Sequence, residues 1–152
     1  MLNELGNPKP YVLYIEDDIE DVELLNFTLE NSGAGFTVLH VNNGEEALRL
    51  LNDYKPFKPL PSLILLDINM SRLDGKETLV CLKADKDIAK IPVVVLTTSN
   101  DTKDISFFSR YDIPYIVKPG DVKQFREKLF ATLEMLLPAG LFRSTTRKTD
   151  AA

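Results

Sequence analysis

Polar side chains that could do chemistry stand directly after four short apolar runs of this chain. Two carboxylates follow the run 12–15, one follows 63–66, a hydroxyl follows 93–96 and an ammonium follows 114–117: Glu16, Asp17, Asp67, Thr97 and Lys118. Charged residues are rarely buried unless they are paired, so a buried strand that ends on Asp67 needs a reason. If the runs are strands of one parallel sheet, their polar ends meet at the edge where such sheets bind ligands.

The three carboxylates suggest a cation and a phosphoryl group. Glu16, Asp17 and Asp67 would repel one another in one pocket unless a cation lies among them. Oxygen ligands favour Mg²⁺, which commonly joins one or two carboxylates to a phosphoryl group. The Thr97 hydroxyl can donate to a phosphoryl oxygen, and Lys118 can supply positive charge. A carboxylate nucleophile, a metal, a hydroxyl and an ammonium are together the parts of a phosphoryl-transfer site.

Each of these residues except Asp67 also has an ordinary explanation when it is taken alone. The acidic run 16–18 suits the start of a loop and a helix cap, threonine is common in strands, and a lysine before a proline is often a surface charge. What favours the chemistry is that polar residues follow the first, third, fourth and fifth apolar runs together.

The elements that would position these residues alternate regularly. Short apolar runs rich in β-branched residues occupy 11–16, 36–41, 62–67, 92–97 and 114–117. Between and after them, apolar residues recur at helical spacing in five segments, for example from Val22 to Leu29 and from Phe125 to Leu136. This alternation predicts an α/β fold, a flavodoxin-like, doubly wound (βα)5 arrangement. Its five-stranded parallel sheet would have the order 2-1-3-4-5 and helices on both faces.

Length and composition fit one domain. The chain has 152 residues, of which 44% are hydrophobic. It contains no apolar stretch approaching the roughly 18 residues of a membrane span and no recognisable signal peptide, so we expect a cytoplasmic protein with no membrane partner. With one cysteine, Cys81, and one histidine, His40, an intramolecular disulfide and a multi-histidine metal site are excluded. The net charge of -5 gives little support to a main role in nucleic-acid binding, and it is explained as readily by solubility.

Four motifs resemble those of the receiver domains of two-component response regulators. They are an acidic pair after the first apolar run, an aspartate followed by Leu-Asp-Gly, a Thr-Thr pair and a Lys-Pro pair, at 12–18, 65–75, 95–98 and 116–119. The motifs occur in the family's order, and the resemblance covers nearly the whole chain. It implies a CheY-like receiver domain at 8–138, with flexible tails at 1–7 and 139–152.

The resemblance also implies a metal site and a modified residue. Mg²⁺ would be held by Glu16, Asp17, Asp67 and the backbone carbonyl of Asn69. Asp67 would be phosphorylated on its side chain, which makes it both a metal ligand and the phosphoacceptor.

Further residues take roles in a switch through the same resemblance. Thr97 would bind the phosphoryl group and move toward it on activation, and Lys118 would pair with that group. Tyr115 would swing inward as Thr97 moves. The bond between Lys118 and Pro119 is expected to be cis, which proline permits at low cost.

The function implied is that of a phosphorelay switch rather than an enzyme. Asp67 would accept a phosphoryl group from a sensor histidine kinase or a phosphotransfer protein, with at most slow autodephosphorylation. No second domain is expected after the last helix, so an unidentified downstream protein would be reached by contact or by phosphorelay, and homodimer formation stays open. The run 17–21 and the insert 52–61 resemble stand-alone receivers that partner phytochrome-type kinases.

Three features depart from the family's pattern. Ser71 stands where proline is usual, so we expect a less rigid loop after Asp67. The interval from Thr97 to Lys118 is one residue shorter than usual, and the segment 110–114 lacks the usual Gly-Ala. We therefore expect a reshaped fourth helix, on a face that commonly carries partner contacts in the family.

Three other functions fit these residues less well. A haloacid-dehalogenase-like phosphatase also uses a strand-end aspartate with magnesium, but it requires a second aspartate where this chain has Asn69. A degenerate receiver that acts only as an interaction module should lack a site residue, whereas all are present. Nucleic-acid binding by the basic tail would need more charge than Arg143, Arg147 and Lys148 supply.

Overall fold

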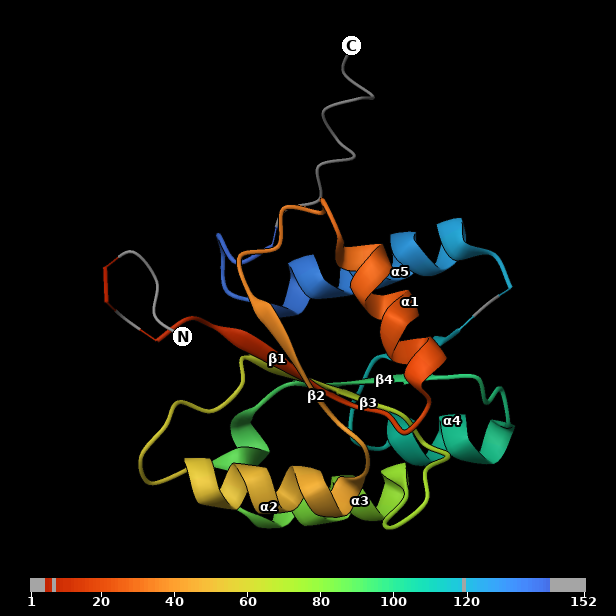
Figure 1. Ribbon diagram of the computed structural model, residues 1–152. Coiled ribbons are helices and arrows are strands. Elements are labelled where there is room, and N and C mark those ends of the chain that lie inside the picture. The colour runs from red at the N-terminus through yellow and green to blue at the C-terminus, as the bar shows by residue number, and fades with distance from the viewer. Residues whose placement is uncertain (1–4, 7, 119, 143–152) are drawn as a thin grey trace.

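A five-stranded parallel sheet lies between two layers of helices in the computed structural model, which describes residues 5–6, 8–118 and 120–142 (Figure 1). In chain order the elements are β1 (Tyr11–Ile15), α1 (Ile19–Leu29), β2 (Thr37–Val41), α2 (Gly44–Tyr54), β3 (Leu63–Leu66), α3 (Gly75–Ala84), the 3-10 helix η1 (Ile88–Lys90), β4 (Val93–Thr97), α4 (Thr102–Ser109), β5 (Tyr115–Val117) and α5 (Val122–Leu136). The strand order β2-β1-β3-β4-β5 confirms the predicted doubly wound fold. The short η1 helix is an addition that the apolar pattern did not indicate.

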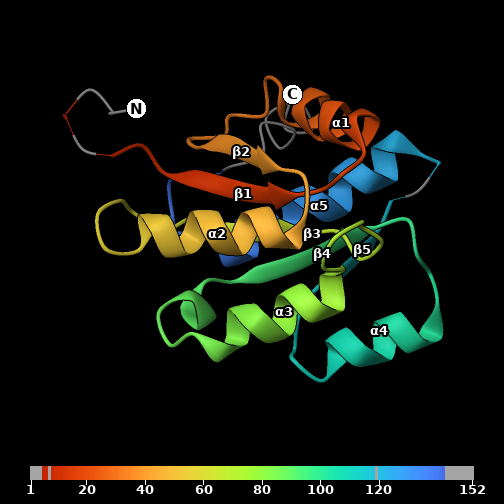
Figure 2. The same ribbon diagram turned by 60° about the horizontal axis from the view of Figure 1, so that its bottom comes forward.

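Each face of the sheet carries its own hydrophobic core, because successive side chains of a strand point to opposite faces. Helices α1 and α5 cover one face, where Leu65 and Leu96 are buried, and α2, α3 and α4 cover the other, where Leu66 and Val95 are buried (Figures 1 and 2). The central strand β3 is buried along its whole length. This double burial explains why its sequence is a continuous apolar run rather than an alternating one.

A side-chain cap fixes the start of every α-helix in the described part of the chain. The cap is an aspartate or asparagine whose side-chain oxygen accepts a hydrogen bond from a backbone amide of the first turn, at Asp18, Asn43, Asp74, Asp101 and Asp121. Such caps satisfy amides that have no partner within the helix. Because each helix begins soon after a strand, the caps help to fix the loops at the carboxyl edge of the sheet.

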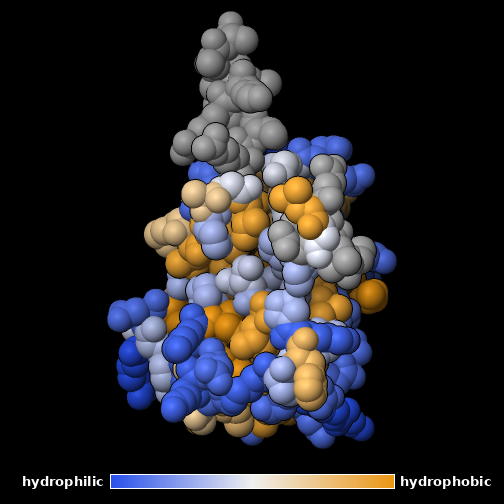
Figure 3. Space-filling model, turned by 90° about the vertical axis from the view of Figure 1, so that its left-hand side faces the viewer, coloured by the Kyte–Doolittle hydropathy of each residue, from blue (hydrophilic) through white to orange (hydrophobic). Residues whose placement is uncertain are grey.

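The opposite edge of the sheet carries an apolar groove. Near the starts of β1 and β2, Tyr11, Val38, Leu39, Tyr54 and Pro59 contribute to its lining. Figure 3 faces this side of the molecule and shows hydrophobic surface in a hollow above a strongly hydrophilic region. The groove is therefore separated by the length of the strands from the edge where the candidate site residues lie.

The end of the described chain packs onto the core that α1 and α5 cover. The Gly35 amide donates a hydrogen bond of 2.7 Å to the Leu141 carbonyl oxygen. The Phe142 ring is only 4% exposed, and it contacts Phe130 edge-on at 5.0 Å between ring centroids. Leu141 and Phe142 thus pack against the core, although the sequence analysis assigned them to a flexible tail from residue 139. The predicted boundaries of the domain stay a prediction.

Two sequence predictions concern positions that the structure leaves out. The expected cis bond before Pro119, and the tails at 1–4, 7 and 143–152, lie outside the described residues. Within the residues that are described, no helix has the length and apolar character needed to span a membrane.

Candidate functional site

The pairing of β1 with β3 brings the predicted carboxylates together. Ile15 lies opposite Leu66 in the parallel register, so Glu16 and Asp67 follow at the same edge. The Asp67 amide donates to the Ile15 carbonyl oxygen at 3.1 Å, which extends the ladder to the site. One carboxylate oxygen each of Glu16, Asp17 and Asp67 lies within 4.8 Å of the others.

This donor set fits a hard divalent cation. Glu16 and Asp67 are buried at 1% and 6% exposure, whereas Asp17 is exposed. Because Asp17 is exposed, a cation bound to all three carboxylates would also face water. This suits Mg²⁺, which retains several of its waters when it binds to a protein. No thiolate or imidazole belongs to the cluster. The chemistry of the cluster therefore fits a divalent cation.

The electrostatics of the two buried carboxylates point the same way. Burial raises the pKa of Glu16 to about 7, and the charge of Asp67 adds to the rise, although hydrogen bonding to Lys118 opposes it. Burial also raises the pKa of Asp67, against the opposing effects of Lys118 and the Thr97 hydroxyl. Even with Lys118 nearby, burial of the two ionised carboxylates is therefore costly, and a bound metal cation would stabilise them.

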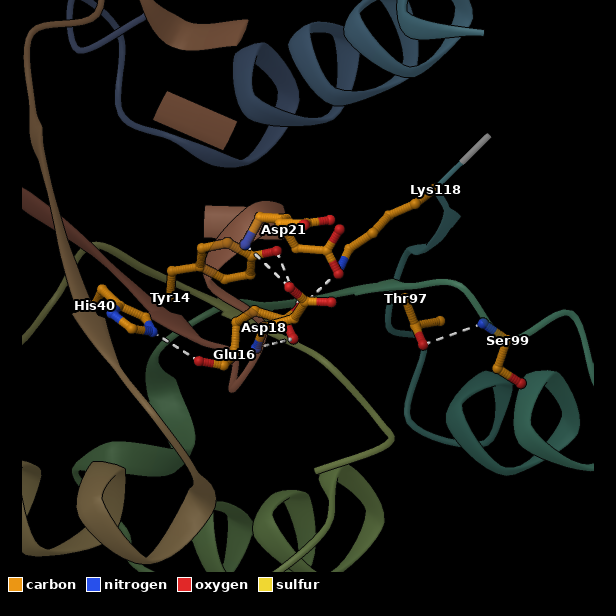
Figure 4. A network of polar contacts seen from close by, with 9 residues as sticks. Tyr14, Glu16, Asp18, Asp21, His40, Thr97, Ser99 and Lys118 are labelled. Atoms are coloured by element: carbon orange, nitrogen blue, oxygen red, sulfur yellow. Dashed lines mark hydrogen bonds and ion pairs between the residues drawn. The ribbon is translucent and has the colours of Figure 1, made fainter. Parts of the chain in front are cut away.

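Lys118 lies beside Glu16 and contacts a carboxylate that the sequence analysis did not single out. Its Nζ is 2.6 Å from Glu16 Oε2 and 2.9 Å from Asp21 Oδ2 (Figure 4). Burial lowers the pKa of Lys118, but hydrogen bonds to the two carboxylates outweigh this effect and raise it overall. Asp21 follows Asp18, the helix cap, by three residues, and this spacing brings it to the site side of α1.

Tyr14 is a second residue that sequence reasoning missed. Its buried hydroxyl donates to Glu16 Oε2 at 3.2 Å, and burial raises its pKa strongly (Figure 4). The Asp18 amide donates to the other carboxylate oxygen, Glu16 Oε1, at 3.1 Å. The alternation of a strand could have identified Tyr14, because residues two apart point to the same face.

Thr97 ends β4 as a fully buried residue, and its neighbour Ser99 links it to Tyr115. The Ser99 amide donates to Thr97 Oγ1 at 3.2 Å, and Tyr115 Oη donates to the Ser99 carbonyl oxygen at 2.7 Å. Ser99 Oγ also donates to Asp104 Oδ2 at 2.6 Å. The serine was not predicted as a site residue, because nothing in its spacing distinguishes it from an ordinary loop residue.

The loop after Asp67 approaches both Asp17 and α3. The Ser71 amide donates to Asp17 Oδ2 at 3.3 Å, a bond that the proline usual at this position could not make. Gly75 packs so tightly that a Cβ there would lie 2.7 Å from Ile68 Cα. The side chain of Asn69 is exposed, and the predicted ligand role of its carbonyl oxygen stays a prediction.

Residues 12–130 match the family model of the response regulator receiver domain, and the chain belongs to this family. Response regulator Rcp1 of Synechocystis sp. is 34% identical over 106 residues, which cover 68% of this chain and 72% of Rcp1. A homologue of the transcriptional regulatory protein CpxR from Haemophilus influenzae is 42% identical over 94 residues, covering 61% of this chain but 36% of that longer protein.

Solved structures show the same relationship. The phosphorylated cyanobacterial phytochrome response regulator RcpA has a TM-score of 0.75 and 31% identity, over 87% of this chain and 100% of that one. The Mn²⁺-bound form of Rcp1 has a TM-score of 0.73 and 32% identity, over the same shares.

The protein is thus a receiver domain, a phosphoacceptor of two-component signalling, and its relatives are regulators rather than enzymes. Response regulators receive phosphate from histidine kinases and act on downstream targets. Receiver domains also bind a divalent metal, for which this chain has an acidic cluster.

Proposed function

We propose that Asp67 is the phosphoacceptor of this receiver domain. The observation that carries the proposal is the cluster of oxygens from Glu16, Asp17 and Asp67 within 4.8 Å of one another. Burial of Asp67 and its electrostatic interaction with Lys118 support the same role. A nucleophilic carboxylate beside a cation site and an ammonium is suited to phosphoryl transfer.

The transfer forms one bond and breaks another. A carboxylate oxygen of Asp67 forms a P–O bond as the P–N bond of a phosphohistidine breaks, and the electron pair stays on the imidazole nitrogen of a sensor kinase or phosphotransfer protein. Mg²⁺ held by Glu16, Asp17, Asp67 and the Asn69 carbonyl would neutralise charge on the phosphoryl group.

After the transfer, the chain's own polar groups hold the phosphoryl group. Thr97 donates its hydroxyl proton to a phosphoryl oxygen, and Lys118 pairs with the added charge. Slow attack by water on the acyl phosphate returns the Asp67 carboxylate and releases inorganic phosphate. The domain therefore resets without being a metabolic enzyme.

Output follows from the polar links around Thr97. When Thr97 turns toward the phosphoryl group, the Ser99 amide loses its acceptor, and Tyr115 responds through its bond to Ser99. The change reaches an unidentified downstream protein by contact, or a second copy of the chain. Similarity to RcpA, a cyanobacterial phytochrome response regulator, supports a phytochrome-type kinase as the phosphodonor. We place the domain in the cytoplasm, as the sequence led us to expect.

Intact mass after incubation with acetyl phosphate tests the assignment. Wild type with Mg²⁺ is expected to gain one adduct of about 80 Da, which is lost in Asp67→Asn and in EDTA. Asp53→Asn is a matched control, since it neutralises an exposed aspartate on α2. An adduct that persists in Asp67→Asn would reassign the phosphoacceptor, and no adduct in folded wild type would overturn the proposal.

A further inference from the structure

The ammonium of Lys118 is held toward α1 rather than by the proposed phosphoacceptor. Its ion pairs within 4 Å, among the described residues, are with Glu16 at 2.6 Å and Asp21 at 2.9 Å, and none is with Asp67. Figure 4 shows the Lys118 side chain extending from the end of β5 to these two carboxylates. The lysine is 5% exposed, so the ammonium has exchanged most of its water for these partners.

We propose that Asp21 is a positioning residue that keeps Lys118 in a resting place beside α1, from which the lysine leaves when Asp67 is phosphorylated. The proposal rests on the proposed function of Asp67 and Lys118. The phosphoryl group then replaces Asp21 as an ion-pair partner of Lys118. The ammonium therefore pairs with Asp21 in the resting state and with the phosphoryl group in the phosphorylated state.

Glu16 has two roles, as a candidate metal ligand and as a partner of Lys118. These two roles explain why Lys118 needs a second carboxylate partner. Glu16 belongs to the oxygen cluster that fits a divalent cation, and it is also the nearer partner of Lys118. Asp21 is not part of that cluster. When Glu16 turns to a cation, Asp21 remains as the carboxylate that can hold the ammonium, so metal binding need not leave Lys118 buried without a partner.

The partly solvated position of Asp21 makes the exchange reversible. Its side chain is 23% exposed, against 1% for Glu16. An ion pair with one partner near solvent is held less firmly than a fully buried one. A phosphoryl group carries about −1.5 to −2 charges, which allows it to compete for the ammonium.

The exchange would also separate two elements that are distant in the sequence. Asp21 lies in the first turn of α1, and Lys118 directly follows β5, 97 residues later. Their ion pair ties the start of α1 to the connection between β5 and α5. Its release gives phosphorylation a route to α1 that does not pass through Thr97 or Tyr115.

The test compares Asp21→Asn with Glu20→Gln. Glu20 is a matched control because it lies in the same turn of α1, is exposed, and has no ion pair with Lys118 in the described part of the chain. Both substitutions remove one negative charge, so their difference isolates the contact. The probes are Mg²⁺ alone, and beryllofluoride at saturating Mg²⁺ as a mimic of the acyl phosphate, both measured by calorimetry.

The two affinities are expected to change in opposite directions. Relative to Glu20→Gln, Asp21→Asn should bind beryllofluoride roughly three- to tenfold more tightly, because the resting partner of the lysine is gone. It should bind Mg²⁺ more weakly, because Lys118 then relies on Glu16 alone. Asp21→Glu keeps the charge and should restore both affinities toward wild type. It also provides a second test if Asp21→Asn folds poorly.

A purely structural role would weaken both affinities, and that outcome would overturn the proposal. So would equal beryllofluoride affinity in Asp21→Asn and Glu20→Gln. The ¹⁵N resonance of Lys118 Nζ gives an independent readout: without metal it should shift in Asp21→Asn and stay in place in Glu20→Gln. If wild type with Mg²⁺ binds no beryllofluoride, the proposed function itself falls, whereas tight binding by wild type without the predicted difference removes only the role of Asp21.

Discussion

Tyr115 Oη donates a hydrogen bond of 2.7 Å to the backbone carbonyl oxygen of Ser99. Because the Ser99 amide donates to Thr97 Oγ1, the two residues proposed for the switch are joined through one loop residue. Ser99 Oγ donates to Asp104 Oδ2, and Lys76 Nζ lies 2.6 Å from Asp104 Oδ1. Hydrogen bonds and an ion pair thus join Thr97 to β5, α4 and α3, and we expect a movement of Thr97 to be transmitted along them.

Tyr115→Phe should break this link while leaving the chemistry at Asp67 in place. One neutral hydrogen bond is lost, so we expect the free energy of unfolding in urea to fall by about 0.5–1.5 kcal/mol. The mass adduct from acetyl phosphate should still form, because Tyr115 is not in the carboxylate cluster. Amide hydrogen exchange of the β4–α4 loop should respond less to beryllofluoride than in wild type.

Tyr111→Phe is the control for this substitution, since Tyr111 is 40% exposed and lies just after α4. It should match wild type in stability and in hydrogen exchange. An undiminished exchange response in Tyr115→Phe would show that the hydroxyl does not couple the two residues.

Stabilisation by Mg²⁺ should grow as pH rises. The folded-state pKa of Glu16 is raised from 4.5 to about 7. Without metal, its contribution to stability is therefore fully present below about 4.5 and lost as pH rises through about 7. A cation relieves this loss, so the difference in Tm between Mg²⁺ and EDTA should increase from about pH 5 to about pH 8.

Glu16→Gln tests the cause of this pH dependence. The glutamine keeps the shape of the side chain but cannot ionise, so the Tm difference should be smaller and depend less on pH. A wild-type difference that stays constant across the range would contradict the assignment of a metal site to Glu16.

Ser71→Pro should weaken metal binding although it restores the residue usual in the family. The substitution removes the amide that donates to Asp17 Oδ2 at 3.3 Å. Groups that orient a metal ligand contribute to its affinity, and this bond is long and exposed, so we expect a loss of roughly two- to fivefold by calorimetry. Ser71→Ala keeps the amide and should match wild type; a similar loss there would assign the effect to the hydroxyl instead.

Gly75→Ala should disturb the loop that carries Asp67. Alanine would normally stabilise a helix relative to glycine, but here its Cβ would meet the backbone of Asp67 and Ile68. We expect a loss of about 1–3 kcal/mol in urea unfolding and weaker Mg²⁺ binding. Gly120→Ala places its Cβ in open space and should be nearly neutral. Equal stability of the two variants would mean that the loop moves aside at no cost.

The sequence predicted what depends on local pattern and on the topology of a parallel sheet. The sequence predicted that Glu16 and Asp67 lie close together, because both directly follow strands that this fold makes neighbours. It could not predict the contact between Asp21 and Lys118, because that contact depends on how α1 packs relative to the end of β5. Spacing along the chain carries no information about contacts between side chains 97 residues apart.

Phe142→Ala should show that the end of the described chain belongs to the folded domain. The ring is 4% exposed and lies between Phe130 and Phe36, at centroid distances of 5.0 and 6.3 Å. Removing a buried aromatic ring leaves a cavity, so we expect the free energy of unfolding in urea to fall by about 3–5 kcal/mol. Phe57→Ala is the matched control, because Phe57 is 89% exposed and its loss should change stability by less than about 0.5 kcal/mol. If Phe142→Ala changed the free energy of unfolding as little as this control, Leu141 and Phe142 would belong to a tail that contributes nothing to the core.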